Sequence, residues 1–292
     1  MLRNLQGKSI VITGAASGIG EALAHACAAR GARLLLADID AVGLERVVTA
    51  VRSKGAECTG TLTDTGSAVA IRALAAVAQE RLGGADIVVN NAGVGLVAPV
   101  DKLQAEDAHW LMNINFWGVV HGCQAFLPQL RTRPDALLVN ISSIFAMVSV
   151  PTQSIYNASK AAVRGFSDSL REELRAELPK EGGANPVDVL CVHPGGIKTN
   201  IVNSARLVDV SMVADSDQQI RESFTRLART TPAQAADVIV EAMERRKTRV
   251  LIGADAVIMD GLFRLFPTRA SRWMSAFGQW LRRHAPRSDT TH

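Results

Sequence analysis

A single tyrosine, Tyr156, occurs among the 292 residues of the sequence, and Lys160 follows it four positions later in the stretch YNASK. Residues four apart on a helix share one face, so the phenol and the ammonium can point at the same spot. A phenol has an ordinary pKa of about 10, and a nearby cation favours the phenolate. We therefore predict that Lys160 lowers the pKa of Tyr156, which exchanges a proton with a bound hydroxyl. The structural alternative is an amphipathic helix on which the two side chains only pack and snorkel.

A glycine-rich turn, TGAASGIG at residues 13–20, lies between an apolar run and a helical pattern. Glycine permits a tight turn and lets a pyrophosphate approach the backbone, while the helix start offers free N–H groups. Asp38 ends the next apolar run, where an acid can bond both ribose hydroxyls of an adenosine and repel a 2′-phosphate. No Lys or Arg lies in the turn or directly after Asp38. The pattern predicts a dinucleotide site that favours NAD over NADP, although a glycine-rich turn or a strand-end acid alone can also be structural.

The elements that must position these residues alternate along the chain. Short apolar runs typical of strands buried on both faces occupy residues 9–13, 33–38, 86–90, 136–142, 187–192 and 249–253, with a weaker run at 57–64. Helical patterns occupy residues 19–30, 41–54, 66–82, 103–130, 154–178 and 233–246. The alternation predicts an α/β fold, a doubly wound Rossmann-type parallel sheet of about seven strands with helices on both faces.

No repeat or boundary interrupts this alternation, so we expect one dinucleotide-binding and catalytic domain over residues 1–254. The less regular stretch 197–230 follows a strand and is expected to be a substrate lid. Residues 255–292 form a C-terminal extension, and within it residues 261–292 carry six arginines against one acid, in a chain of net charge +4. The extension is predicted to form a basic amphipathic helix whose apolar stripe consists of Trp273, Phe277, Trp280 and Leu281.

Over residues 7–253 these motifs resemble those of the short-chain dehydrogenase/reductase family. The family's T-G-x-x-x-G-x-G turn is matched by Thr13, Gly14, Gly18 and Gly20, and its N-N-A-G motif by Asn90, Asn91, Ala92 and Gly93. Its catalytic pattern is matched by Asn115, Ser143, Tyr156 and Lys160, and its P-G motif by Pro194 and Gly195. Ser143 precedes Tyr156 by 13 residues, the family's usual interval, which favours it over Ser142.

The resemblance also implies roles for single residues. Ser143 would hydrogen-bond the substrate oxygen, Asn115 would hold a water in a proton path from Lys160, and Lys160 would bind the nicotinamide ribose. Ile197 and Thr199 resemble residues that hold the nicotinamide carboxamide, and Asp64 one that lies beside the adenine. The full expected cofactor site comprises Thr13, Gly14, Ser17, Gly18, Ile19, Gly20, Asp38, Asp64, Asn91, Ala92, Gly93, Tyr156, Lys160, Pro194, Gly195, Ile197 and Thr199.

Apolar segments follow the strands that should lie beside the reaction centre. They contain Val94, Leu96, Val97, Ile144, Phe145, Met147, Val148 and Val150. Ligands of open α/β sheets lie beyond the carboxyl ends of the strands, so these side chains predict a hydrophobic substrate, unless they only pack under the lid. We predict an NAD-dependent oxidoreductase that interconverts a hydrophobic secondary alcohol and its ketone. The alternatives are an NADPH-dependent ketoreductase of acyl-thioester ketones and a non-catalytic dinucleotide-binding scaffold.

Other classes of function find little support. The four cysteines lack C-x-x-C spacing and nearby histidines, so no metal site is expected. His25, His109, His121 and His193 lack a recognisable Ser or Asp partner and are taken as structural. No nucleic-acid fold is recognisable.

The expected surroundings follow from the chain ends and from the resemblance. The N-terminus lacks signal-peptide order and no apolar run is long enough to cross a bilayer, so a cytoplasmic protein is expected. The basic tail can lie peripherally on an anionic membrane, cover the active site or pack on a neighbouring subunit. The resemblance implies a homodimer or homotetramer assembled through helices that match residues 103–130 and 154–178.

Overall fold

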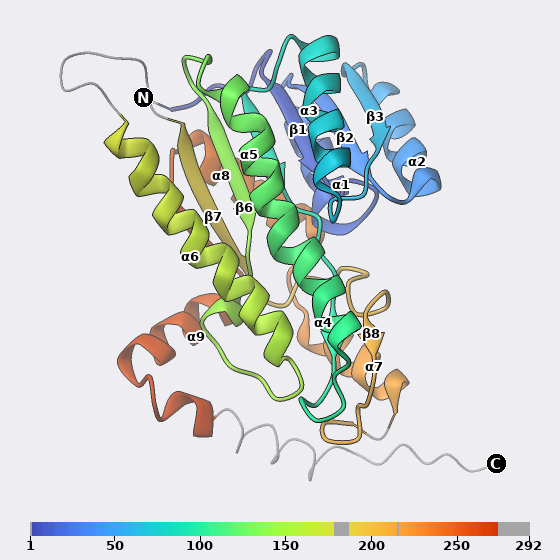
Figure 1. The fold of residues 1–292 in the computed structure, drawn as a ribbon, viewed down its shortest axis with the longest axis vertical. Helices are drawn as coiled ribbons and strands as arrows, with labels where there is room; N and C mark the ends of the chain where they lie inside the picture. The colour runs from blue at the N-terminus through green and yellow to red at the C-terminus, as the bar shows by residue number, and fades with distance from the viewer. Residues whose placement is uncertain (1, 178–186, 215, 274–292) are drawn as a thin grey trace.

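The computed structural model describes residues 2–177, 187–214 and 216–273, and its centre is a seven-stranded parallel sheet. The strand order is β3-β2-β1-β4-β6-β7-β9 (Figure 1). The strands are β1 (Ser9–Thr13), β2 (Arg33–Asp38), β3 (Cys58–Leu62), β4 (Ile87–Asn90), β6 (Leu137–Ile141), β7 (Asp188–Pro194) and β9 (Arg249–Ile252). The order reverses between β1 and β4, which is the switch point of a doubly wound sheet. The predicted fold class is confirmed.

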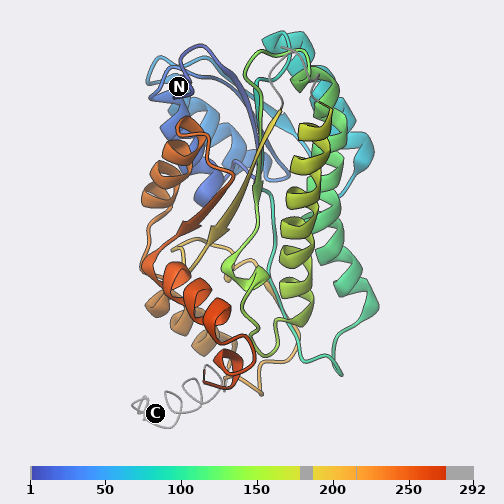
Figure 2. The same ribbon diagram turned by 90° about the vertical axis from the view of Figure 1, so that its left-hand side faces the viewer.

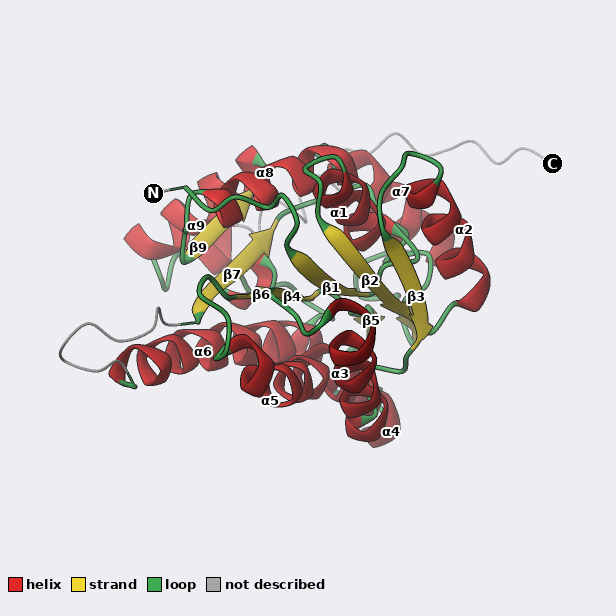
Figure 3. Ribbon diagram, turned by 90° about the horizontal axis from the view of Figure 1, so that it is seen from above, coloured by secondary structure: helices red, strands yellow, loops and turns green. Residues whose placement is uncertain are grey.

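Two helical layers enclose the sheet, which lies edge-on between them in Figure 2. One layer contains α1 (Gly18–Ala28), α2 (Ala41–Arg52) and α8 (Pro232–Glu244), and the other α3 (Ala68–Leu82), α5 (Gly118–Leu130) and α6 (Ser154–Ala176) (Figure 3). Each layer closes its own apolar cluster against the sheet. Alternate residues of β1 belong to different clusters, Ile10 and Ile12 to one and Val11 to the other. The central strands are therefore apolar throughout because both faces are buried.

The stretch predicted as one helix, residues 103–130, is interrupted. It comprises α4 (Ala105–Met112), a π-helical turn η1 (Asn113–Trp117) and α5. Asn115 lies in this turn, and its side chain forms two hydrogen bonds with the backbone of Val94, in the loop after β4. The local widening of the helix accompanies this contact, and such turns are frequent at functional sites.

The segments beyond the sheet gather at the carboxyl ends of the strands. The expected lid, residues 197–230, contains β8 (Arg206–Leu207) and α7 (Asp217–Leu227), and β8 pairs in parallel with β5 (Leu96–Val97). A short 3-10 turn, η2 (Ile144–Ala146), follows β6.

The extension beyond residue 254 begins with α9 (Ala254–Leu265), which follows β9 directly. Of the predicted apolar stripe only Trp273, 46% exposed, is described, whereas Phe277, Trp280 and Leu281 lie outside the described residues. Within the described ranges, no helix has the length and apolar character needed to span a membrane.

Candidate active site

A cavity of about 790 Å³ opens at the carboxyl ends of the strands. It brings together most of the residues that the sequence predicted. These are Gly14, Ser17, Gly18, Ile19, Asp38, Asp64, Asn91, Ala92, Gly93, Ser143, Tyr156, Lys160, Pro194, Gly195, Ile197 and Thr199. Three predicted residues, Thr13, Gly20 and Asn115, do not line the cavity but support it from behind.

The glycine-rich turn between β1 and α1 is held from the N-N-A-G segment. The Asn91 amide nitrogen Nδ2 donates to the carbonyl oxygens of Thr13 at 2.9 Å and Gly14 at 3.0 Å. Thr13 Oγ1 accepts from the backbone nitrogen of Asn91 at 3.0 Å. Gly14 has φ +64°, and a Cβ there would lie 2.7 Å from Cα of Ala92. The turn is therefore closed tightly against the loop after β4, and a side chain at Gly14 is excluded.

Two carboxylates lie at the end of the cavity beside this turn. Asp38, the last residue of β2, accepts from the backbone nitrogens of Ala16 at 2.9 Å and Asp40 at 3.0 Å. Asp64, in the segment after β3, accepts from the nitrogen of Gly66 at 2.9 Å. Among the described residues that line the cavity, Lys160 is the only cation. This end is therefore suited to neutral ribose hydroxyls and not to an additional phosphate.

Helix α6 brings Tyr156 and Lys160 into the opposite part of the cavity. Lys160 is buried, its Nζ donates to the carbonyl oxygen of Ile141 at 3.1 Å and lies 5.9 Å from the centre of the Tyr156 ring. Burial lowers the pKa of Lys160 to about 8. No ion pair of Lys160 is found in the described part of the chain, so little offsets the desolvation of its ammonium.

The pKa of Tyr156 is raised above its ordinary value. Burial disfavours the phenolate, and a hydrogen bond with Ser143 only partly opposes that effect. The prediction that Lys160 lowers the pKa of Tyr156 is wrong for this arrangement. The lysine donates to the carbonyl of Ile141, and its Nζ lies 5.9 Å from the centre of the tyrosine ring. Tyr156 is therefore a protonated phenol at neutral pH.

Two neighbouring serines after β6 have different partners. Ser143 lines the cavity, and its Oγ accepts from the nitrogen of Phe145 at 3.1 Å, at the start of η2. Ser142 Oγ donates to the carbonyl oxygen of Lys160 at 2.8 Å and is buried against α6. The geometry thus favours Ser143 over Ser142 as the serine available to a ligand.

Asn115 is fully buried behind the cavity. Its Oδ1 accepts from the nitrogen of Val94 at 2.8 Å, and its Nδ2 donates to the carbonyl of Val94 at 3.0 Å and to Ser159 Oγ at 3.3 Å. Ser159 lies next to Lys160 on α6. Asn115 therefore connects the loop after β4 to the helix that carries Tyr156 and Lys160.

His193, taken as structural from the sequence, lies behind Ser143. The ring is 1% exposed, and its Nδ1 is 3.2 Å from the carbonyl oxygen of Ser143. Burial lowers the pKa of His193 to about 4, so the ring is neutral at physiological pH and can donate one N–H to this carbonyl. No sequence motif indicated this contact.

The remaining wall of the cavity is apolar. Val94, Leu96, Val97, Ile144 and Phe145 line it as predicted. Met147, Val148 and Val150 instead pack with Ile144 against α9. Residues 197–230 and α9 add apolar residues that the sequence did not single out, namely Ile201, Val202, Ile220, Phe224, Leu227 and Met259.

Contacts with α4 hold β8, in the first part of residues 197–230. Arg206 in β8 places its guanidinium 3.8 Å from the centre of the Trp110 ring and pairs with Asp107 at 2.6 Å. A cation over an aromatic ring and a charge-assisted hydrogen bond both orient the arginine. Strand β8 is thereby attached to the helix that precedes Asn115.

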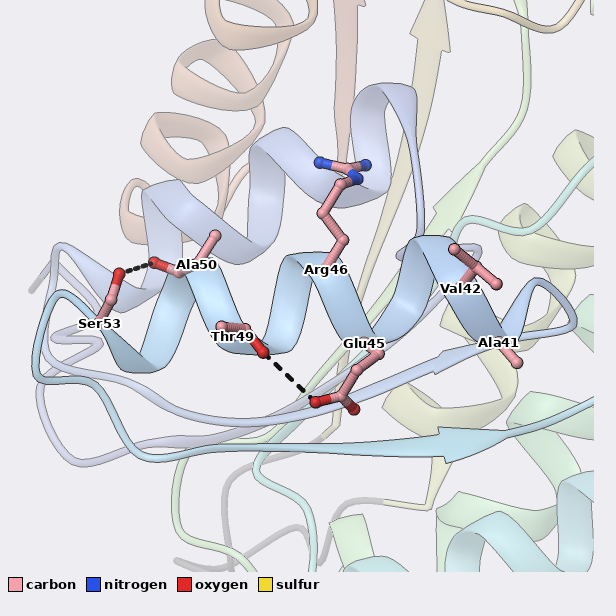
Figure 4. A pocket seen from close by; sticks show the side chains of 7 residues that line it. All are labelled: Ala41, Val42, Glu45, Arg46, Thr49, Ala50 and Ser53. Atoms are coloured by element: carbon pink, nitrogen blue, oxygen red, sulfur yellow. Dashed lines mark hydrogen bonds between the residues drawn. The ribbon is translucent and has the colours of Figure 1, made fainter.

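The exposed side of α2 carries a second, shallow hollow (Figure 4). Its lining residues all come from α2 and its C-cap, and the polar contacts within it are Thr49 Oγ1 to Glu45 at 3.3 Å and Ser53 Oγ to the carbonyl of Ala50 at 3.0 Å. It contains none of the predicted site residues. In the described ranges, no group of His, Cys, Asp and Glu could hold a metal ion.

The fold and the cavity define a nucleotide-binding oxidoreductase, and comparison with known proteins gives its family. Residues 8–208 match the short chain dehydrogenase family. The Mycobacterium tuberculosis protein SadH, named as an oxidoreductase, is 38% identical over 276 residues, which cover 94% of this chain and 96% of SadH. The chain belongs to the short-chain dehydrogenase/reductase family, and the resemblance stated from the motifs is confirmed.

Solved structures agree with this assignment. A short-chain dehydrogenase/reductase from Burkholderia phymatum, crystallised in complex with NAD, has a TM-score of 0.79 and 30% identity, covering 90% of this chain and 96% of its own. A short-chain dehydrogenase from Streptomyces avermitilis has a TM-score of 0.77 and 27% identity, covering 93% and 98%.

Proposed function

We propose that the protein transfers hydride between NAD(H) and a hydrophobic secondary alcohol or ketone. The observation that carries the proposal is one cavity with Asp38 at one end, Tyr156 and Ser143 at the other, and an apolar wall beside them. The glycine-rich turn also supports nucleotide binding there. Because Gly14 has no side chain, a diphosphate can approach the backbone of the turn closely. The NAD complex of the Burkholderia phymatum protein also supports it.

In this proposal the residues of the chain bind and orient the reactants and move one proton. NAD supplies the hydride acceptor, or NADH the donor, when it is bound. Tyr156 gives its phenolic proton to the ketone oxygen or takes one from the alcohol, and Ser143 hydrogen-bonds the same oxygen. Lys160 binds the nicotinamide ribose, and Asn115 fixes the position of the loop and of α6. Since the pKa of Tyr156 is raised, proton donation to a ketone is favoured at neutral pH and alcohol oxidation at alkaline pH.

The residues proposed to hold the dinucleotide are those predicted from the sequence. Asp38 accepts from the ribose hydroxyls of the adenosine, and Asp64 lies beside the adenine. Gly14, Ser17, Gly18 and Ile19 face the pyrophosphate at the start of α1. Thr13, Gly20 and Asn91 keep that turn closed. The residues proposed to contact the nicotinamide and its ribose are Ala92, Gly93, Tyr156, Lys160, Pro194, Gly195, Ile197 and Thr199.

Titration of NADH and NADPH into the purified protein tests the cofactor. We expect NADH to bind more tightly than NADPH, and Asp38→Ala to weaken NADH by roughly tenfold through loss of charge-assisted hydrogen bonds. Glu45→Ala, which removes an acid from the exposed side of α2, is the matched control and should leave binding unchanged. Tighter binding of NADPH would contradict the proposal and favour the acyl-thioester ketoreductase alternative.

A substrate screen then tests the reaction. Hydrophobic secondary alcohols of steroid, terpenoid and fatty type should be turned over more efficiently than sugars or small hydroxy acids, because the cavity beside Tyr156 is lined by residues such as Phe145, Phe224 and Met259. Turnover of sugars in preference would contradict the hydrophobic substrate class. Cofactor binding without turnover of any alcohol or ketone would favour the scaffold alternative.

We also propose that the chain assembles as a homodimer or homotetramer through α4, α5 and α6. Trp117, 46% exposed, stacks on His121 at a centroid distance of 6.1 Å beside these helices. An exposed tryptophan is typical of a contact surface. Sedimentation velocity of the wild type and Trp117→Glu should show an assembly that the charge dissociates, and an unchanged assembly in the variant would place the interface elsewhere.

Peripheral contact with an anionic membrane is proposed for the C-terminal extension, of which α9 is the described helix, and the outer side of α9 supports it. Val257, Ile258 and Leu265 are more than half exposed there, and Arg264 and Arg269 are exposed nearby. Apolar side chains flanked by arginines fit the boundary of an anionic bilayer. The full chain should co-sediment with phosphatidylserine vesicles and not with phosphatidylcholine vesicles, and Val257→Glu with Leu265→Glu should abolish binding. No binding of the wild type at low salt would overturn this proposal.

The sequence predicts a catalytic domain over residues 1–254, and this boundary stays a prediction. We propose that the catalytic domain continues through α9. Asp255 and Met259 of that helix line the cavity, and α9 packs against η2 through Ala256 and Phe263. Residues 197–230 are proposed as the substrate lid.

A further inference from the structure

The start of α9 supplies a carboxylate to the cavity that no sequence motif indicated. Asp255, the second residue of α9, accepts from the backbone nitrogen of Gly196 at 2.7 Å. Its side chain lines the same cavity as Tyr156. An acid in the first turn of a helix interacts favourably with the helix dipole. The contact joins α9 to the turn after β7.

Glycines around Asp255 leave the space that its carboxylate fills. A Cβ at Gly195 would overlap the carboxylate, and so would a Cβ at Gly253, which also has φ +93°. The backbone nitrogen of Gly195 donates to the carbonyl of Ile252 at 2.9 Å. The turn after β7 is thus attached both to the end of β9 and to the side chain of Asp255.

The lid holds the other side of the same turn. Ile197 forms an isolated parallel bridge with Thr230, and the backbone nitrogen of Lys198 donates to the carbonyl of Thr230 at 2.9 Å. Ile197 therefore lies between a segment fixed by Asp255 and a segment fixed by the lid. Loss of the Asp255 contact would free the backbone nitrogen of Gly196, while its carbonyl would still accept from the nitrogen of Thr230 at 3.4 Å.

We infer that Asp255 is a positioning residue for the nicotinamide end of the cavity, acting through Gly196 on the turn from Gly195 to Ile197. The inference rests on the proposed function, because it takes that turn as the part of the protein that meets the nicotinamide. Its consequence is that the residues after 254 contribute to dinucleotide binding. A contact that only anchored α9 would instead affect stability without distinguishing one end of the dinucleotide from the other.

Binding of two ligands separates these possibilities. ADP-ribose contains the adenosine, the diphosphate and the second ribose of NADH and lacks only the nicotinamide ring, so it lacks the group that the turn from Gly195 to Ile197 is proposed to meet. Dissociation constants of NADH and ADP-ribose are measured by calorimetry for the wild type, Asp255→Ala, Asp255→Asn and Asp237→Ala. Asp237 is an exposed acid of α8 and serves as the matched control for loss of one charge. Hydrogen exchange of the peptide that contains residues 194–197 is followed in parallel.

Asp255→Ala should weaken NADH by roughly tenfold and leave ADP-ribose within about twofold, since a hydrogen bond to a charged group is lost at one end only. Asp255→Asn keeps an oxygen acceptor and should restore most of the NADH affinity. Exchange at residues 194–197 should accelerate in Asp255→Ala, and Asp237→Ala should match the wild type throughout.

Two results would overturn the inference: unchanged NADH binding by Asp255→Ala, or equal weakening of NADH and ADP-ribose. A wild-type protein that binds neither ligand would instead overturn the proposed function, on which the inference rests. The two failures are distinguishable, because the first appears only in the variant and the second already in the wild type.

Discussion

The two ends of the central sheet use charge in opposite ways. At the amino ends of the strands, near the N-terminus in Figure 1, Arg3 is 2% exposed and pairs with Asp135 at 3.0 Å and Asp188 at 2.6 Å. Arg246 pairs with the same two acids. At the carboxyl ends, Lys160 is equally buried but has no ion pair within the described residues.

We interpret this as a difference between a region that stabilises the fold and the candidate active site. Buried charges that are paired and hydrogen-bonded fix the geometry of a fold, and removing one partner is destabilising. A buried charge without a counterion raises the free energy of the folded state, and groups of perturbed pKa gather at functional sites for that reason. Substitutions at the Arg3 end should therefore lower stability, and those at the Lys160 end should lower activity.

The largest expected effect comes from Tyr156→Phe. It removes the proton-exchanging hydroxyl and should lower kcat by about 10²–10⁴-fold, the usual contribution of general acid–base catalysis. NADH affinity and the urea midpoint should stay close to wild type, because the ring and its packing on Phe145 remain. A variant that kept most of its turnover would contradict both the role of Tyr156 and the comparison.

Arg3→Met should have the largest effect on stability. The substitution leaves Asp135 and Asp188 with Arg246 as their partner and removes a donor to the carbonyl of Met243. The free energy of unfolding should therefore fall by about 2–4 kcal/mol. Urea unfolding measures it, with Arg246→Met as the control, since that more exposed arginine should cost less. A loss of kcat without a loss of stability would reverse the assignment of the two ends.

Lys160→Met should abolish most activity and yet stabilise the fold at pH 7. The folded pKa of about 8 lies below the ordinary 10.5, so the charged lysine opposes folding at neutral pH, on the order of 3 kcal/mol. Between those two values the unfolded chain binds a proton that the folded chain does not, and wild-type stability rises with pH. The advantage of the variant should accordingly shrink from pH 8 to pH 10 in thermal unfolding curves, and a constant advantage would contradict the lowered pKa.

The smallest effect is expected from His193→Asn, which keeps a donor for the Ser143 carbonyl but cannot titrate. The folded pKa of His193, about 4, lies below the ordinary 6.5, so only the unfolded chain binds a proton between these values. Wild-type stability should fall as the pH drops from 6.5 to 4, and less so in the variant. If the free energy of unfolding depended on pH in the same way for both proteins, His193 would not titrate as its burial implies.

The sheet could be predicted closely from the sequence because its strands are buried on both faces. The runs at 9–13 and 33–38 coincide with β1 and β2. The break within residues 103–130 could not be predicted from periodicity, because it accompanies the hydrogen bonds between Asn115 and Val94, 21 positions apart in sequence. The pairing of β5 with β8 joins segments that lie even further apart, and neither has a strand-like pattern of its own.

The cofactor end of the site was predictable because backbone geometry demands particular residue types there, such as Gly14 with its left-handed φ. The contact of Asp255 could not be predicted, because a single acid at the start of a helix is usually exposed to solvent. Only the folded structure shows that it lies against the turn after β7. Met259 was missed for a similar reason, since its neighbours Val257 and Ile258 are exposed and equally apolar. The effect of Lys160 on Tyr156 was predicted wrongly because sequence spacing shows proximity but not desolvation.

The hydrogen bonds between Asn91, Thr13 and the glycine-rich turn should affect how fast a nucleotide can bind. The turn is already in its closed shape through hydrogen bonds within the protein, so its conformational entropy is lost during folding and not at the encounter with the ligand. A docking surface that needs no rearrangement is limited by diffusion and orientation alone. We therefore expect the glycine-rich turn to stay rigid when a nucleotide binds, and slower rearrangements to involve residues 197–230.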